Sequence, residues 1–203
     1  PSSAGAGEHV LLVASDVTEQ RAEAQARFEA ALAQREMLVK EVHHRIKNNL
    51  QGVAGLLQQN AARHPEVAAI LTESVGQVQA IAQVYGLQVG SGGPLRVASV
   101  LEAIALSVQR TFGRTVRVQV LGDEVARLLL PEAESIPIAL TLNELLTNAV
   151  KHSAQGEVRC EMSPHGDALR VAIRNAGRLR EGFSLAQFPD SLRGAMRVLP
   201  LDP

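Results

Sequence analysis

The sequence is poor in aromatic residues, which make up 2% of its 203 residues and include no tryptophan. A hydrophobic core must therefore be aliphatic, which suits helix packing and small α/β layers. The shortage also argues against binding of single-stranded nucleic acid, because that binding stacks bases on aromatic rings. The net charge is −1, so no overall field favours nucleic acid or a membrane surface.

Cysteine and long apolar runs are scarce as well. Cys160 is the single cysteine, so no intramolecular disulfide can form, and the sequence fits a reducing compartment. No apolar run approaches the roughly 20 residues that span a bilayer. The opening "PSSAGAGEHV" lacks the basic start and apolar middle of a signal peptide. We expect a cytoplasmic chain, or the cytoplasmic portion of a membrane-anchored protein, since a start at Pro1 in a Ser/Gly/Ala stretch indicates a fragment.

A long segment without proline follows a short opening strand. The stretch "HVLLVASDVTEQ" predicts a strand at residues 9–13 and a helix start capped by Asp16, with Glu19 as its capping-box partner. The helix is predicted from Val17 to about Ala62. Its apolar residues recur at alternating steps of four and three, which defines a heptad seam. The seam consists of Phe28, Leu32, Arg35, Val39, Val42, Ile46, Asn49, Val53 and Leu56.

A second helix with the same alternation is predicted after Pro65, from about Glu66 to Leu87. Two seamed helices joined by a short turn predict an antiparallel hairpin. One hairpin leaves apolar surface uncovered, so we expect two copies to form a homodimeric four-helix bundle.

The second half of the sequence has a different pattern. The Gly-rich "VGSGGP", residues 89–94, predicts a domain boundary. Beyond it we expect a helix over 97–111, a strand in "TVRVQVLG" that "ARLLLP" pairs with, and a long helix that starts or kinks at Pro137. The segments "GEVRCEMS" and "ALRVAIRN" predict a β-hairpin, and the remaining residues a loop and one short helix. The fold class is therefore α+β.

Two adjacent histidines stand in the stretch "EVHHRIKNNLQ", residues 41–51. At about 100° per residue, Val42 and Ile46 lie together on the seam, and His44 lies almost opposite them. We therefore expect His44 to face solvent, while His43 lies on the flank of the seam. A neutral imidazole is a good nucleophile near pH 7, so His44 is a candidate for phosphoryl transfer. The alternative is an ordinary surface histidine.

The neighbours of His44 favour a bound anion. Arg45, Lys47 and Asn48 cluster on adjacent faces, and we expect the two cations to have no acidic partner. A zinc site is rejected, because adjacent histidines diverge on a helix and no Cys or acidic ligand follows at metal spacing. Asn49, on the seam itself, is expected to fix the register of the bundle rather than to act in catalysis.

The stretch "LVKEVHHRIKNNLQGVAGLL" closely resembles the dimerisation and phosphoacceptor helix of two-component sensor histidine kinases. It is similar to the subfamily related to the HWE kinases, in which the phosphoacceptor is the histidine just before an arginine. The resemblance implies that His44 accepts the phosphoryl group, with His43 as the second choice. With His44 as the phosphoacceptor, we expect the clustered Arg45, Lys47 and Asn48 to lie beside the phosphate.

A second stretch, "LTLNELLTNAVKHS", resembles the asparagine box of a GHKL-type ATPase domain. The resemblance implies that Asn148 coordinates magnesium, that Glu144 polarises the reacting group or organises the metal, and that Lys151 and His152 contact phosphate. Residues 144, 148, 151 and 152 recur at helical spacing and are expected to share one face. An amide oxygen and a carboxylate suit a hard cation, and a lysine suits phosphate. Taken alone, the same residues would equally form a solvated helix face.

The glycine boxes depart from the family pattern. In "NAGRL", Asn175 replaces the aspartate that accepts a hydrogen bond from adenine, Gly177 matches the first glycine, and Leu179 replaces the second. The lid stretch "PDSLRGAMRVLP" contains Gly194 alone. The GHKL-type α/β sandwich is therefore expected to be degenerate or truncated.

These resemblances divide the chain into four parts. They are the end of a PAS-like sensor domain (1–16), a helical linker (17–35), the dimerisation and phosphotransfer hairpin (36–90) and a GHKL-like domain (95–203). The implied function is autophosphorylation of a histidine from ATP and Mg²⁺, followed by transfer to an aspartate of a response-regulator receiver domain. The alternative is a histidine phosphotransferase or scaffold that binds ATP weakly or not at all.

Overall fold

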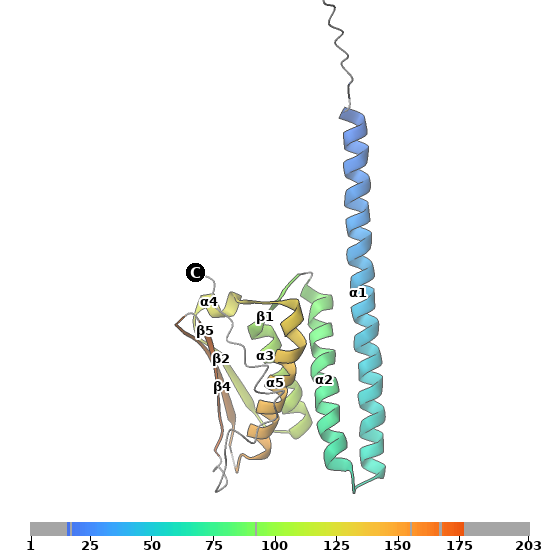
Figure 1. The fold of residues 1–203 in the computed structure, drawn as a ribbon. Coiled ribbons are helices and arrows are strands. Elements are labelled where there is room, and N and C mark those ends of the chain that lie inside the picture. The colour runs from blue at the N-terminus through green and yellow to red at the C-terminus, as the bar shows by residue number, and fades with distance from the viewer. Residues whose placement is uncertain (1–15, 17, 92, 155, 167, 177–203) are drawn as a thin grey trace, which may run out of the picture. The chain divides into compact units, whose positions relative to one another are not determined.

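The structure is a computed structural model that describes residues 16, 18–91, 93–154, 156–166 and 168–176. It has the α+β fold expected from the sequence (Figure 1). The chain divides into two compact units, residues 1–39 and 40–203. The elements in chain order are α1 (Thr18–Arg63), α2 (Ala68–Ser91), β1 (Leu95–Arg96), α3 (Val97–Phe112), β2 (Val116–Val120), α4 (Asp123–Arg127), β3 (Leu129–Leu130), α5 (Glu132–Lys151), β4 (Val158–His165) and β5 (Ala168–Arg174).

The long first helix is confirmed as α1 (Thr18–Arg63). The carboxylate of Asp16 accepts a hydrogen bond from the Thr18 backbone N–H at 2.9 Å, which is the predicted cap. Hydrogen bonding to Thr18 holds the pKa of the Asp16 carboxyl below its usual range. The predicted strand at residues 9–13 lies outside the described residues. Within the first unit, every described residue of α1 is exposed.

The predicted heptad seam is not the face of α1 that packs against α2. Within the second unit, the seam residues Val42, Val53 and Leu56 are 52%, 46% and 62% exposed. The less exposed stripe of α1 in this unit is the neighbouring one, which consists of His43, Lys47, Leu50, Ala54, Leu57 and Ala61, and the seam residue Ile46 at its edge is half-buried as well. Ala54 is buried, and its small side chain allows the two helices to approach closely. The hairpin therefore forms through this second stripe and leaves most of the apolar seam uncovered.

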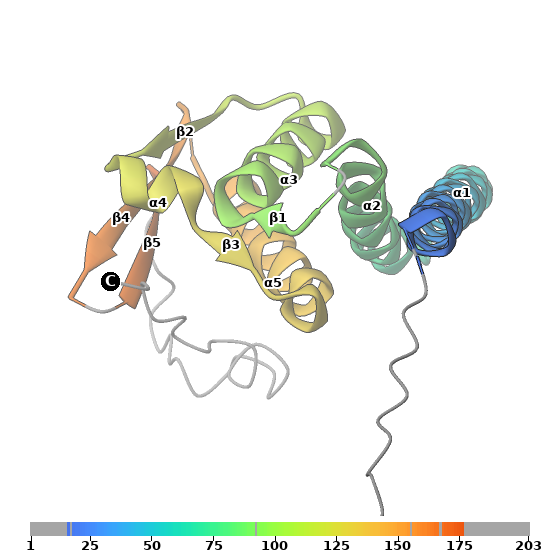
Figure 2. The same cartoon turned by 90° about the horizontal axis from the view of Figure 1, so that it is seen from above.

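The sheet of the second unit has three strands in the order β2–β4–β5. Strand β2 runs parallel to β4, and β4 runs antiparallel to β5, which confirms the predicted hairpin. Helices α3 and α5 pack against each other and cover one face of this sheet (Figure 2). The prediction that "ARLLLP" pairs with "TVRVQVLG" is wrong. Leu130 pairs with Leu95 in a separate two-stranded sheet, and both side chains are buried.

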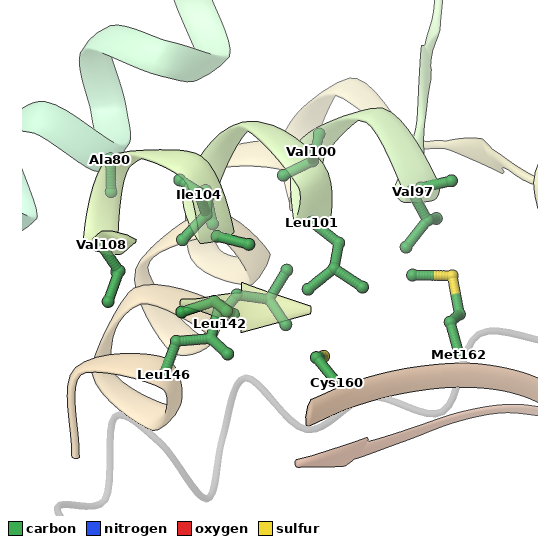
Figure 3. Close-up of a cluster of buried hydrophobic side chains, with 14 of the residues drawn as sticks. Ala80, Val97, Val100, Leu101, Ile104, Val108, Leu142, Leu146, Cys160 and Met162 are labelled. Carbon is green, nitrogen blue, oxygen red and sulfur yellow. The ribbon is translucent and has the colours of Figure 1, made fainter. Parts of the chain in front are cut away.

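The core between these layers is aliphatic, as the shortage of aromatic residues predicted. Val100, Leu101 and Ile104 of α3 are fully buried, and Figure 3 shows them beside Cys160 and Met162 of β4. Burial raises the pKa of the Cys160 thiol to about 11. Cys160 is therefore a neutral packing residue at physiological pH.

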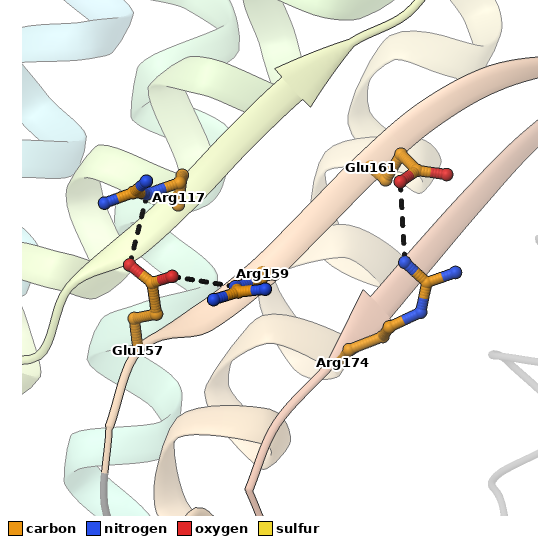
Figure 4. Close-up of polar contacts among 5 residues, drawn as sticks. All are labelled: Arg117, Glu157, Arg159, Glu161 and Arg174. Carbon is orange, nitrogen blue, oxygen red and sulfur yellow. Dashed lines mark hydrogen bonds and ion pairs between the residues drawn. The ribbon is translucent and has the colours of Figure 1, made fainter.

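The opposite face of the sheet is polar. Glu157 pairs with Arg117 at 3.1 Å and with Arg159 at 2.7 Å, and Glu161 pairs with Arg174 at 3.4 Å (Figure 4). The hydrogen bond from Arg159 holds the pKa of the Glu157 carboxyl below its usual range. Strand β4 alternates between this face and the buried face, which is typical of a sheet covered on one side.

Several helix boundaries differ from the prediction. Helix α2 begins at Ala68 and continues to Ser91, so the predicted linker at 89–94 is helical in its first part. Helix α5 begins at Glu132, and Pro137 lies inside it rather than at its start. Elements α4 and β1 were not predicted, because a two-residue strand and a one-turn helix leave no periodic pattern. The strand expected in "ARLLLP" is confirmed as β3, with a different partner. The loop and short helix expected after residue 176 lie outside the described residues.

Across the described residues, no helix is both long enough and apolar enough to cross a membrane.

Candidate functional site

The two adjacent histidines of α1 have different surroundings. His44 is exposed, as the helical-wheel argument predicted, while His43 is half-buried. The ring of His43 lies against the ring of Tyr85 on α2, with the centroids 5.5 Å apart and the planes tilted by 56°. His43 thus helps to hold the hairpin together, and His44 presents its ring to solvent.

The ring of His44 contacts a side chain one turn further along the same helix. Its Nδ1 lies 3.2 Å from Nδ2 of Asn48. This spacing of four residues places both side chains on one face of α1. The contact orients the imidazole without covering it, because both residues are exposed.

The basic residues beside His44 are already engaged. Arg45 donates a 2.6 Å hydrogen bond from Nε to the Glu41 carboxylate, and this bond holds the pKa of Glu41 below its usual range. The expectation that Arg45 has no acidic partner is therefore wrong. The side chain of Lys47 lies against Gly86 of α2. A Cβ added to Gly86 would be 3.4 Å from both Cδ and Cε of Lys47. The stem of Lys47 braces the hairpin, as long cationic side chains often do.

The asparagine-box helix, α5, packs against α2. Glu144 accepts a 3.0 Å hydrogen bond from Nε2 of Gln77, a residue of α2. Asn143 is buried, and a Cβ added to Gly76 would lie 3.3 Å from its Nδ2. Sequence reasoning missed Asn143. The available signal was Gly76, because a glycine inside a helix can mark the close approach of another element.

The other asparagine-box residues lie at the end of α5. Asn148 is half-buried, and Lys151, which is exposed, is the last residue of the helix. His152 is the C-cap residue of α5, with φ −98° and ψ 4°. It therefore lies just outside the helix, and the expectation that it shares a helix face with residues 144, 148 and 151 does not hold for it. Glu144 and Lys151 both line a narrow cavity between α2, α3 and α5.

Asn175 lies beside the same end of α5. Its Nδ2 donates a 3.0 Å hydrogen bond to the backbone carbonyl of Ala149. Asn175 follows β5 directly, and its hydrogen-bond partner Ala149 is the residue next to Asn148 in α5. The structure thus brings Asn175 close to the end of α5 that carries Asn148. Gly177 lies outside the described residues.

Helix α2 contacts both groups of candidate residues. Gln77 bonds to Glu144, and Tyr85 packs against His43. These two α2 residues are eight positions apart, or about 12 Å along the helix axis. Between α1, α2 and α3 lies a groove of about 550 Å³, lined on the α1 side by Gln51, Ala54, Gly55 and Gln58. Positions 51, 55 and 58 continue the stripe that carries His44 and Asn48.

Known proteins resemble this chain in sequence. Residues 41–112 match the family model HisKA_2, described as histidine kinase. The chain is 30% identical over 200 residues to sensor histidine kinase PdtaS of Mycobacterium tuberculosis, which covers 93% of this chain and 38% of that protein. It is 31% identical over 180 residues to PdtaS of Mycolicibacterium smegmatis, covering 84% of this chain and 35% of that protein. The chain thus spans well under half the length of these relatives.

Solved structures share the fold. The histidine kinase domain of the blue-light activated histidine kinase EL346 from Erythrobacter litoralis aligns with a TM-score of 0.52 and 19% identity, over 80% of this chain and 83% of that one. A longer structure of the same kinase aligns with a TM-score of 0.51 and 23% identity, over 70% of this chain and 54% of that one.

The helical hairpin followed by a small mixed sheet covered by helices is the fold that this chain shares with the histidine kinase domain of EL346. The sequence matches identify the class of the chain, which is that of the histidine kinases. Residues 41–112 belong to the histidine kinase family HisKA_2, and the chain is similar to sensor histidine kinases over 93% of its length.

Proposed function

We propose that this chain transfers the γ-phosphoryl group of Mg-ATP to His44 and then passes it to an aspartate of a response-regulator receiver domain. The observation that carries the proposal is the difference between the two histidines. His44 is exposed on α1, whereas His43 is held against Tyr85. A phosphoryl donor and a receiver domain must both reach the same ring, and the exposed ring suits that requirement.

The residues of α5 have the donor chemistry that Mg-ATP requires. Asn148 offers an amide oxygen for Mg²⁺, Glu144 a carboxylate, and Lys151 an ammonium group for phosphate. His152 follows as a second phosphate contact. The Nδ2 of Asn175 donates a hydrogen bond to Ala149, and its Oδ1 would accept a hydrogen bond from the adenine amino group. Bound Mg-ATP would supply the phosphoryl group, and positioning with charge neutralisation would account for most of the catalysis.

The proposal also includes a homodimer, in which two copies of this chain associate through their helical hairpins. The seam of α1 exposes Val42, Val53 and Leu56, and α2 adds Ile70, which is 69% exposed. A stripe of large apolar side chains on one helical hairpin favours association. Two hairpins joined through this stripe would form a four-helix bundle with His44 on its outer surface.

The second candidate function is a phosphotransferase or scaffold that relays phosphate through His44 without using ATP. Two observations favour it. Leu179 stands where the family has a second glycine. In addition, the Glu144 carboxylate already accepts a hydrogen bond from Gln77, which competes with a role for Glu144 at the reacting group or the metal.

Incorporation of label from γ-labelled ATP and Mg²⁺ separates the two functions. The wild type, His44→Ala, Asn148→Ala and His43→Ala are compared. The kinase predicts an acid-labile, alkali-stable label in the wild type that is lost in His44→Ala and Asn148→Ala and retained in His43→Ala. Absence of label in the wild type, with phosphate accepted from a phosphorylated receiver domain, supports the relay. Label that survives in His44→Ala but disappears in His43→Ala would assign the phosphoacceptor to the other histidine.

A further inference from the structure

Helix α2 meets the asparagine-box helix, α5, through two consecutive residues on each side. Gly76 lies against buried Asn143, and a Cβ added to this glycine would be 3.3 Å from Nδ2 of that side chain. Gln77 donates a 3.0 Å hydrogen bond from Nε2 to Oε1 of Glu144. We call these four residues the α2–α5 contact. Because Glu144 is a proposed site residue, α2 engages the candidate site directly.

The α2–α5 contact is polar, although it is partly buried. Asn143 and Thr147 are 6% and 8% exposed and line a narrow cavity between α2, α3 and α5. A buried polar side chain stabilises an interface only where it finds a hydrogen-bond partner. Among the residues that the structure describes, the single side-chain hydrogen bond between α2 and α5 is the one from Gln77 to Glu144. The contact is therefore weakly held.

The C-terminal half of α2 is held in a different way. Ala80 and Val84 are both 1% exposed and belong to the aliphatic core shared with α3 and α5. Burial of apolar surface fixes this half of the helix. A helix with one half in the core and a polar contact on the other can release that contact without unfolding the core.

The side of α5 that faces α2 carries two of the proposed ATP-binding residues. Glu144 and Lys151 both line the cavity against α2. A carboxylate that serves Mg²⁺ or the reacting group must turn its oxygens toward that ligand. In the structure, Oε1 of Glu144 is turned toward the N–H of Gln77 instead.

We infer that the α2–α5 contact withholds Glu144 from phosphoryl transfer, and that release of α2 makes this carboxylate available. The inference rests on the proposed function and concerns the regulation of the same site. The protein then has a closed arrangement, which the structure describes, and an open one that binds Mg-ATP productively. Whatever weakens the contact favours the open arrangement, and Mg-ATP favours the release of α2 in turn.

Substitutions at Gln77 test the inference, because they change the contact in opposite directions. Gln77→Glu keeps the size of the side chain but sets a second carboxylate against Glu144, which repels it. Gln77→Lys supplies an ammonium group that attracts Glu144. Gln77 is exposed, and all three residue types favour a helix, so both variants should fold. The matched controls are Gln83→Glu and Gln83→Lys, since Gln83 also lies on α2 but lines the groove beside α1 and α3.

Two measurements are made on the full chain. The first is the initial rate of label incorporation from γ-labelled ATP and Mg²⁺. The second reports the opening of the contact without nucleotide. Thr147→Cys, introduced into each protein for this second measurement alone, places a thiol in the cavity under α2, and its rate of alkylation by neutral iodoacetamide follows the open population. Buried Cys160 is the internal reference in every protein.

Gln77→Glu should raise both the labelling rate and the alkylation rate by about two- to tenfold, the typical effect of one hydrogen bond. Gln77→Lys should lower both rates by a similar factor. The two Gln83 variants should match the wild type in both measurements.

Three results would overturn the inference. The first is a change of the same sign in Gln77→Glu and Gln77→Lys, which would give Gln77 a merely structural role. The second is the wild-type rate in both variants. The third is a change in labelling without any change in alkylation. Absence of label in every protein, with alkylation still fastest in Gln77→Glu and slowest in Gln77→Lys, would instead reject the kinase proposal and leave the release of α2 standing.

Discussion

The uncovered seam of α1 predicts that Leu56→Gln weakens self-association. Leu56 is 62% exposed in the single chain. Burying a whole leucine side chain contributes about 1.5–3 kcal/mol, so covering this fraction contributes about 1–2 kcal/mol for each copy. A symmetric dimer contains two copies, which gives about 2–4 kcal/mol per dimer. The dissociation constant should therefore rise by about 30- to 700-fold. Glutamine is chosen because it has nearly the helix propensity of leucine.

Sedimentation velocity over a range of protein concentrations measures this change. The matched control is Leu129→Gln, since Leu129 is 53% exposed but lies on β3, away from the helical hairpin. We expect the control to associate as the wild type does. The reasoning is refuted if Leu56→Gln and Leu129→Gln have the same dissociation constant, or if the wild type remains a monomer throughout the range.

Three further substitutions and one alkylation measurement test the packing of the second unit. Gly55→Ala should raise the melting temperature by about 2–4 °C, because nothing lies within 4 Å of the added Cβ and alanine favours the helix. Gly76→Ala should show a smaller gain or a loss, because its Cβ would lie 3.3 Å from buried Asn143; an equal gain at both sites would contradict this packing. Leu101→Ala should lower the unfolding free energy by about 2–5 kcal/mol in urea titration, because Leu101 is 0% exposed; a change below about 1 kcal/mol would contradict its place in the core. At pH 8, Cys160, with its pKa raised to about 11, should be in the thiolate form in about one molecule in a thousand and should resist alkylation until the protein unfolds; rapid alkylation of the native protein would contradict its burial.

Much of the fold followed from periodicity, and the exceptions have physical reasons. The proline-free run predicted α1 to within two residues at each end. The heptad pattern of α1 was recognised from the sequence, but the face of α1 that packs on α2 was not, because sequence spacing alone does not decide which of two adjacent stripes meets the other helix. The stripe that contains Ala54 packs against α2, because a small residue permits the closest approach of two helices. The pairing of Leu95 with Leu130 was missed because two residues carry no alternation.

The candidate site was predictable in part for the same reasons. The outward orientation of His44 followed from the wheel angle alone, since that angle depends only on the helix. The pairing of Arg45 with Glu41 was also within reach of the sequence, because the two lie four residues apart on one helix. The bond between Gln77 and Glu144 was not, since 67 positions separate the residues and only the packing of α5 on α2 brings them together.

The central claim is that α1 presents one histidine for phosphorylation, and locating the phosphate tests it most directly. The protein is incubated with ATP and Mg²⁺, digested at neutral or alkaline pH, and sequenced by mass spectrometry with a fragmentation method that preserves the N–P bond. The account predicts phosphate on His44 and an unmodified His43 in the same peptide. Phosphate on His43, or on a residue outside α1, would contradict it.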